Sequence, residues 1–151
     1  MAELTNTIAP GELAMSGQED TARTSHNAAA TLLKPGYFVC AIDSSGDGNL
    51  ERRGVTYPTD VDSIVLGVVK KWMFKDEHPE KDQVSYYVRG AVGVPVAASV
   101  KAGDPVFAIF TVGATRGQAT NVAGVNAVPV GARFLSTTLA GEVAIVSLNL
   151  S

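Results

Sequence analysis

The stretch VGVPVAASVKAGDPVFAIFT, residues 92–111, decides the fold class. Short runs of Val, Ala and Phe flank the segment Lys-Ala-Gly-Asp at 101–104, where Gly and Asp favour a tight turn. The β-branched residues on either side fit the pleated surface of a sheet. The stretch therefore predicts a β-hairpin whose second strand covers 105–111. Pro95 predicts that the first strand lies at an edge of the sheet or begins there.

The same alternation of short apolar runs and turn residues continues on both sides of this hairpin. It predicts further strands at 37–42, 63–72, 84–89, 125–130, 132–137 and 142–150. Gly67, inside one of these runs, predicts a bulge or a close approach of two backbones. Strands repeated at intervals of about 8–12 residues are typical of sandwiches and barrels. The sequence thus predicts an all-β fold, a small β-barrel or jelly-roll-like sandwich.

The first 31 residues differ from the rest of the chain. They are rich in Ala, Thr, Ser and Asn, and their apolar residues are isolated: Leu4, Ile8, Leu13 and Met15. Since no strand or helix period persists, we predict an extended, partly irregular N-terminal arm at 1–31 and a single β-rich body at 32–151. One or two helical turns within 20–33, capped by Asp20 or Thr21, are the alternative for the end of this arm.

Formal charges are distributed unevenly along the chain. Of 12 basic and 15 acidic residues, only five lie beyond residue 89: Lys101, Asp104, Arg116, Arg133 and Glu142. Because the centres of protein interfaces are depleted of charge, we predict that this C-terminal part supplies a subunit interface. The net charge of −3 and the lack of a basic cluster argue against direct nucleic-acid binding.

The sequence carries no assembled catalytic or metal motif. His26 and His78 are the only histidines and Cys40 is the only cysteine, so no intrachain disulfide forms. His78 is expected in an exposed loop without zinc ligands at a workable spacing. Residues 43–48 match the start of a calcium loop, but its twelfth position is Gly54 instead of Glu. We therefore expect no metal, no cofactor and no enzymatic activity.

Nothing in the sequence predicts membrane insertion or secretion. No apolar run approaches the roughly 20 residues of a membrane-spanning helix. Residues 1–17 lack the basic segment and apolar core of a signal peptide. We expect a protein that is made in a cytosol-like compartment.

Five segments together resemble the layout of tailed-bacteriophage capsid cement (decoration) proteins. They lie at 36–39, 64–69, 95–107, 131–135 and 140–146, and the resemblance covers about residues 10–150. It implies a small β-rich protein that binds the outer surface of an icosahedral head as a homo-oligomer. Such a protein joins neighbouring major capsid subunits and stabilises the expanded shell.

The resemblance also implies partners and a location. The partners are the major capsid protein and further copies of this chain, with a trimer preferred over a dimer. The chain would be made in the cytoplasm of the bacterial host and end on the outside of the virion. As capsid or subunit contacts we predict the isolated apolar residues of the arm and two alternating aromatic residues: Leu4, Ile8, Leu13, Met15, Trp72 and Phe74.

Two other functions compete with this interpretation. A fibre-base or glycan-binding module of a virion would use Trp72, Tyr86 or Tyr87 to stack on sugar rings. A trimeric β hydrolase acting on nucleotides would need an acidic cluster near a Gly-rich phosphate loop, and the charged residues do not follow that pattern.

Overall fold

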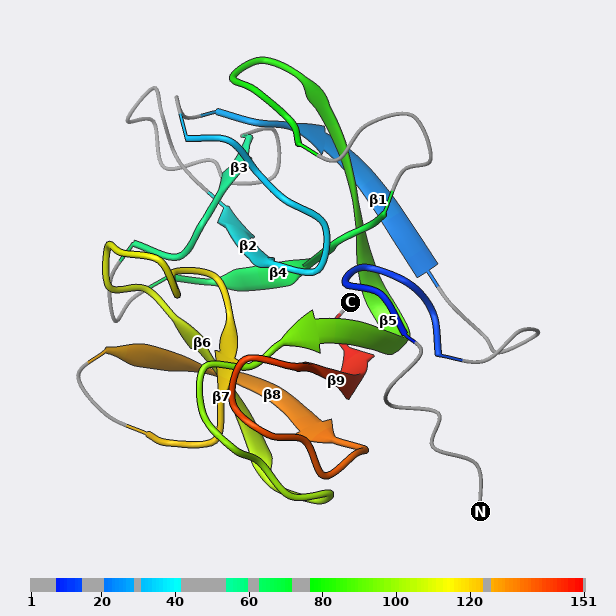
Figure 1. Cartoon of the computed structure of the whole chain (residues 1–151). Helices are drawn as coiled ribbons and strands as arrows, with labels where there is room; N and C mark the ends of the chain where they lie inside the picture. Colours follow the sequence, from blue (N-terminus) through cyan, green and yellow to red (C-terminus); the bar gives the residue numbers. More distant parts are fainter. Residues whose placement is uncertain are drawn as a thin grey trace.

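The computed structural model is an all-β fold (Figure 1). It describes residues 8–14, 21–28, 31–41, 54–59, 63–71, 77–123 and 126–150. These residues contain no helix, and they form nine strands: β1 (Thr21–His26), β2 (Phe38–Ala41), β3 (Val55–Thr56), β4 (Val65–Val69), β5 (Gln83–Pro95), β6 (Pro105–Ile109), β7 (Ala119–Thr120), β8 (Ala127–Phe134) and β9 (Val143–Asn149).

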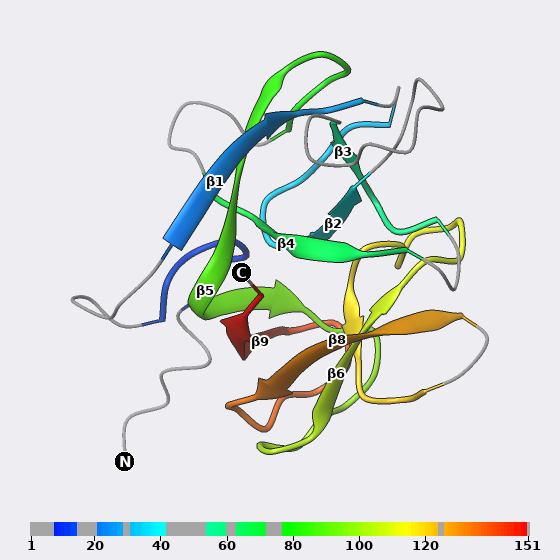
Figure 2. The same cartoon turned by 180° about the vertical axis from the view of Figure 1, so that it is seen from behind.

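The strands form one curled antiparallel sheet in the order β3-β2-β4-β5-β9-β8-β6-β7, and β1 pairs with β5 outside this path. The long strand β5 joins two lobes (Figures 1 and 2). Its first half pairs with β1 and β4, and its second half pairs with β9. We call β1–β4 with the first half of β5 the first lobe, and the second half of β5 with β6–β9 the second lobe.

The buried residues form two hydrophobic clusters, one centred on each lobe, and the cluster of the second lobe also takes in Phe38, Val68 and Tyr87 of the first lobe. In the second lobe, Phe134, Val92 and Val146 are almost fully buried, and in the first lobe Val39 and Val84 are inaccessible to solvent. Strand β8 shows how the sequence directs this burial, because its residues alternate between buried and exposed over most of its length. Successive side chains of a strand point to opposite faces, so the Val, Ala and Phe residues of β8 fill the core.

The all-β prediction is confirmed, and so are the strands predicted at 37–42, 63–72 and 142–150, which contain β2, β4 and β9. The runs at 125–130 and 132–137 merge into the single strand β8, and Pro95 ends β5. Gly67 marks the predicted close approach, because a Cβ on it would clash with the carbonyl oxygen of Tyr87.

The predicted hairpin at 92–111 is wrong, although its turn exists. Asp104 N–H donates to the carbonyl of Lys101 at 3.0 Å, but β6 then pairs with β8 and β7 and not with β5. The reason is that both edges of β5 at 91–93 are already occupied, one by β9 and the other by residues 11–14.

The helical turns considered for 20–33 are also wrong, since Thr21–His26 is strand β1 and pairs with the first half of β5. That pairing places β1 in the sheet of the body. The division into an arm at 1–31 and a body at 32–151 otherwise stays a prediction.

Candidate interaction surfaces

The two histidines lie in different surroundings. His78 was expected in an exposed loop, and this is wrong, because only 2% of it is exposed. Its backbone exchanges two hydrogen bonds with Leu33, and its Nδ1 lies 2.9 Å from Oδ2 of Asp82. His26 is exposed on β1. No group of three or more His, Cys, Asp or Glu that could hold a metal occurs among the described residues.

Two charged side chains of the second lobe, Asp104 and Arg133, have hydrogen-bond partners within the protein. Asp104 Oδ2 accepts hydrogen bonds from the Asn121 amide at 2.8 Å and from the backbone N–H of Lys101 at 2.9 Å. The Asn121 bond, followed by that of Lys101, lowers the pKa of Asp104. Arg133 donates to the carbonyl of Gly103 at 3.1 Å. Asp104 and Arg133 therefore each have a partner within the lobe, while the side chains of Lys101, Arg133 and Glu142 are exposed.

Apolar side chains are exposed on the same lobe. They are Val112, Val122, Leu135 and Leu139, with exposed fractions of 83, 61, 51 and 65%. A hollow of about 320 Å³ lies beside Val122 and is lined only by uncharged residues, including Ile109, Thr120 and Asn126. Exposed apolar side chains beside an uncharged hollow are typical of a surface that binds another protein.

The loop that carries Leu135 and Leu139 is held in place by hydrogen bonds to neighbouring segments. Thr138 exchanges two backbone hydrogen bonds with Val100, and Ala102 N–H donates to Oγ1 of Thr137 at 3.2 Å. Inside the loop, Ser136 Oγ accepts a hydrogen bond from the N–H of Ile145 at 3.0 Å. Leu135 and Leu139 are thus presented on a preformed loop, which reduces the entropy lost on binding.

Of the six predicted contact residues, the structure describes two. Ile8 and Leu13 belong to a strap, residues 8–14, that lies on the second half of β5. Leu13 is half-buried against the core of the second lobe and forms a β-bridge with Val92. Leu4, Met15, Trp72 and Phe74 lie outside the described residues.

The strap is bonded to the body at several points. Gly11 N–H donates to the carbonyl of Gly93 at 2.8 Å, and Gly93 N–H donates to the carbonyl of Glu12 at 2.9 Å. Lys71 N–H donates to the carbonyl of Gly11, and the Lys71 amine lies 3.7 Å from the Glu12 carboxylate. A further hollow of about 420 Å³, lined in part by Pro10 and Lys34, lies beside it. Sequence patterns did not predict this docking, because most of the bonds that hold the strap join backbone groups of distant segments.

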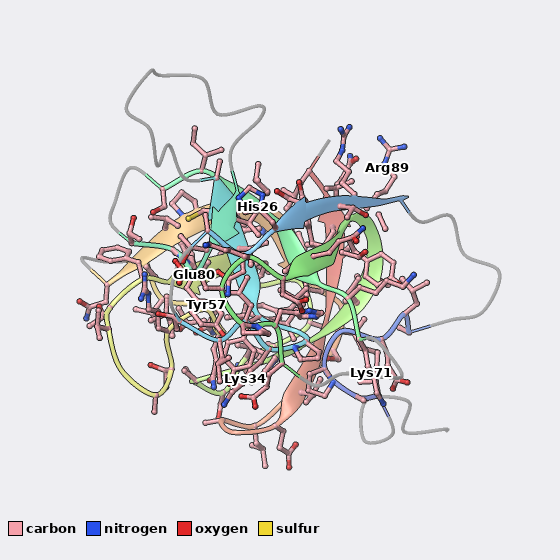
Figure 3. The ribbon with its side chains drawn as sticks, turned by 90° about the horizontal axis from the view of Figure 1, so that it is seen from above. His26, Lys34, Tyr57, Lys71, Glu80 and Arg89 are labelled. Atoms are coloured by element: carbon pink, nitrogen blue, oxygen red, sulfur yellow. The ribbon has the colours of Figure 1, made fainter. Side chains whose placement is uncertain are left out.

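A polar and aromatic cluster joins the two lobes. Arg116 of the second lobe donates from Nε to the carbonyl of Pro58 at 2.8 Å, and its guanidinium lies 5.9 Å from the ring centre of Tyr57. Tyr57 Oη accepts a hydrogen bond from the N–H of Lys34 at 3.0 Å. Both residues are labelled in Figure 3. Burial raises the pKa of Tyr57 to about 12. The sequence analysis did not predict this cluster.

The tyrosines proposed for sugar stacking do not serve that purpose. Tyr86 and Tyr87 are only 7 and 5% exposed and belong to the two cores. Their rings therefore stabilise the fold. No helix among the described residues is long and apolar enough to cross a membrane.

Comparison with known proteins places the chain in a specific group. The family model described as structural cement protein (E217 gp24/Pam3 gp6) matches residues 2–149. Among solved structures, a chain from the capsid of Myoviridae Phage XM1 is similar, with a TM-score of 0.75 and 20% identity. The match covers 99% of this chain and 94% of that chain, and at this identity it shows a shared fold. No curated protein matches the sequence.

Proposed function

Because this chain belongs to the structural cement protein family of phages, and so has a structural, capsid-stabilising role, we propose how it acts on the head. It binds the outer surface of an icosahedral shell as a homo-oligomer, with a trimer preferred over a dimer, and joins neighbouring major capsid subunits. It is made in the cytoplasm of the bacterial host. The family match over residues 2–149 is the observation that carries this proposal.

The second lobe is the surface that we assign to these contacts. It exposes Val112, Val122, Leu135 and Leu139, while Asp104, Arg116 and Arg133 are bonded within the protein. Exposed apolar side chains favour an apolar surface on the partner, because burying an unpaired charge against them is costly. The residues predicted from sequence, Leu4, Ile8, Leu13, Met15, Trp72 and Phe74, are proposed as additional contacts.

Stabilisation of the shell then follows from multivalency. Each copy holds its neighbours and the shell through separate weak contacts. Once one contact has formed, the next is effectively intramolecular, so the lattice is much stronger than any single contact. Joining subunits needs no reaction and no cofactor, and we propose that the protein is not an enzyme.

Cryo-electron microscopy of expanded, undecorated heads mixed with the purified protein tests the function. Ordered density at symmetry-related outer sites is expected, and bare shells at saturating protein would reject the proposal. Val112→Asp and Leu139→Asp should weaken binding about ten-fold or more, since each buries a charge. Ile64→Asp is the matched control, because Ile64 is 56% exposed but lies in the first lobe.

The arm is tested separately. A deletion of residues 2–7 removes Leu4 but leaves the bonded strap at 8–14 intact. We expect weaker head binding or a smaller oligomer. If both are unchanged, the arm has no part in the mechanism.

A further inference from the structure

The outer face of β6 and β8 is exposed and carries a single charge. The two strands pair with Phe107 opposite Pro129 and with Pro105 opposite Arg133 (Figure 2). Side chains of residues directly opposite each other lie on the same face of a sheet. On this face Pro105, Pro129, Gly131 and Arg133 are exposed and Phe107 is half-buried, while the alternate residues of both strands are buried. We call these five residues the outer β6–β8 face.

Gly131 leaves a gap in the middle of this face. No described atom lies within 4 Å of a Cβ built at Gly131. Pro129 and Arg133 lie two residues to either side, each about 7 Å away along the strand. Arg133 donates from Nη1 to the carbonyl of Gly103 at 3.1 Å, which holds its guanidinium in place. A partner that fits this face therefore offers one apolar side chain for the gap and, about 7 Å away, one carboxylate for the guanidinium.

The turn at 139–142 of the same chain carries these two groups. Leu139 is 65% exposed, and Glu142 is the only exposed acidic residue that the structure describes beyond residue 89. Glu142 N–H donates to the carbonyl of Leu139 at 3.1 Å. This bond closes a β-turn, in which the Cα atoms of the first and fourth residues lie less than about 7 Å apart. Gly141 N–H donates to the carbonyl of Val96 at 2.9 Å, so the turn is preformed.

The two charges cannot meet within one copy. Neither Arg133 nor Glu142 forms an ion pair with a residue that the structure describes. Arg133 lies opposite Ser147 of β9, and Glu142 lies five positions before Ser147, about 16 Å along the chain. Each charge therefore needs its partner on another molecule.

The charges also decide how two copies meet. Two outer β6–β8 faces placed against each other would bring Arg133 close to Arg133, and two turns would bring Glu142 close to Glu142. Like charges at an interface are destabilising. The face of one copy and the turn of the next instead carry opposite charges. Such a head-to-tail contact closes into a ring when the rotation between copies allows it, as in a trimer.

We propose that the turn at 139–142 of one copy docks on the outer β6–β8 face of the next copy, with Leu139 over Gly131 and Glu142 bonded to Arg133. The separations agree, because both the two turn residues and the two face residues lie about 7 Å apart. The inference rests on the homo-oligomer of the proposed function and names the contact that joins its subunits.

Disulfide trapping tests this contact. The double variant Arg133→Cys with Glu142→Cys is oxidised in solution and on expanded heads, and then separated without reductant. We expect covalent dimers and larger species, because about 16 Å within one chain exceeds the roughly 7 Å between Cα atoms that a disulfide spans. Cys40 is only 2% exposed, so background cross-linking is low. The control, Lys34→Cys with Glu142→Cys, uses an exposed base of the first lobe and should stay monomeric.

Several results would overturn the proposal. They are a disulfide confined to one chain, equal cross-linking in the control, covalent dimers of either single variant, or no cross-link in either sample. Decorated heads without the cross-link would reject this inference alone. Cross-linked protein that leaves heads bare would reject the proposed function and keep the contact between copies.

Exchange of the two charges provides an independent test. Arg133→Glu and Glu142→Arg should each raise the dissociation constant of the oligomer about ten-fold or more, with an unchanged circular dichroism spectrum. The variant with both changes should return to within about three-fold of the original value, because the pair is restored with its signs reversed. Lys34→Glu makes the same charge change in the first lobe and should have no effect. A double variant as weak as the single variants would contradict the pairing of Glu142 with Arg133.

Discussion

The contact between the two lobes can be tested with the single substitution Gly117→Ala. Gly117 has a φ of +87°, and a Cβ on it would lie 2.9 Å from Cδ1 of Tyr57 and 3.0 Å from Cδ2 of Tyr37. The left-handed backbone costs an alanine about 1–2 kcal/mol. Forcing a methyl group against two packed rings adds about 1–3 kcal/mol. We therefore expect the free energy of unfolding to fall by about 2–5 kcal/mol.

Gly141→Ala separates these two contributions. Gly141 has the same φ of +87°, but nothing lies within 4 Å of a Cβ at this position. Its substitution should cost only the backbone contribution, about 1–2 kcal/mol. The difference between the two variants then measures the contact of Gly117 with the tyrosine rings.

Thermal and urea unfolding, followed by circular dichroism, provide the measurement. For a domain of this size, 1 kcal/mol corresponds to about 2–4 °C in Tm. Gly117→Ala should lower Tm by between about 4 and 20 °C, and Gly141→Ala by between about 2 and 8 °C. Equal losses in the two variants would refute the reasoning, because the rings would then leave room for the methyl group.

Three further variants probe neighbouring groups. Arg116→Ala should lower the free energy of unfolding by about 1–3 kcal/mol in urea, since the charged donor to Pro58 is lost, and an unchanged urea midpoint would contradict this. Burial raises the pKa of Tyr57 to about 12 from 10, so its contribution to stability is complete below pH 10 and is lost as the pH rises through 12. Tyr57→Phe should therefore flatten the fall of the urea midpoint in this range, and an equally steep fall would exclude Tyr57 as its cause. The Asn121 bond lowers the pKa of Asp104, so its contribution is present above pH 3.8 and disappears at lower pH. Asp104→Asn should lower Tm at pH 7 but not at pH 2.5, and equal shifts at both values would contradict this assignment.

The strands were predictable because their signal is local. Alternating apolar residues and turn residues identified β2, β4 and β9, and the turn at 101–104 forms as expected. The choice of pairing partner was not predictable in the same way. Strand β6 pairs with β8 because β5 is occupied on both edges, and that occupation depends on residues far away in the sequence.

The same distinction explains the errors at β1 and His78. Residues 21–26 have weak strand character of their own, and they are extended because β5 offers a free edge. The charged neighbours of His78 suggested exposure. Its burial follows from the backbone pairing with Leu33, 45 positions earlier in the sequence, and from Asp82, which binds its ring.

The sequence by itself determined the all-β class, the separation of charge between the two parts of the chain and the layout that resembles cement proteins. All three are properties of composition and of short patterns, and they do not depend on the course of the chain in space. Only the tertiary structure decided that Arg116 and Asp104 are bonded internally and that the strap covers β5. Each of these depends on hydrogen bonds between backbone or side-chain groups of distant segments, and such geometry is fixed only when the whole chain packs.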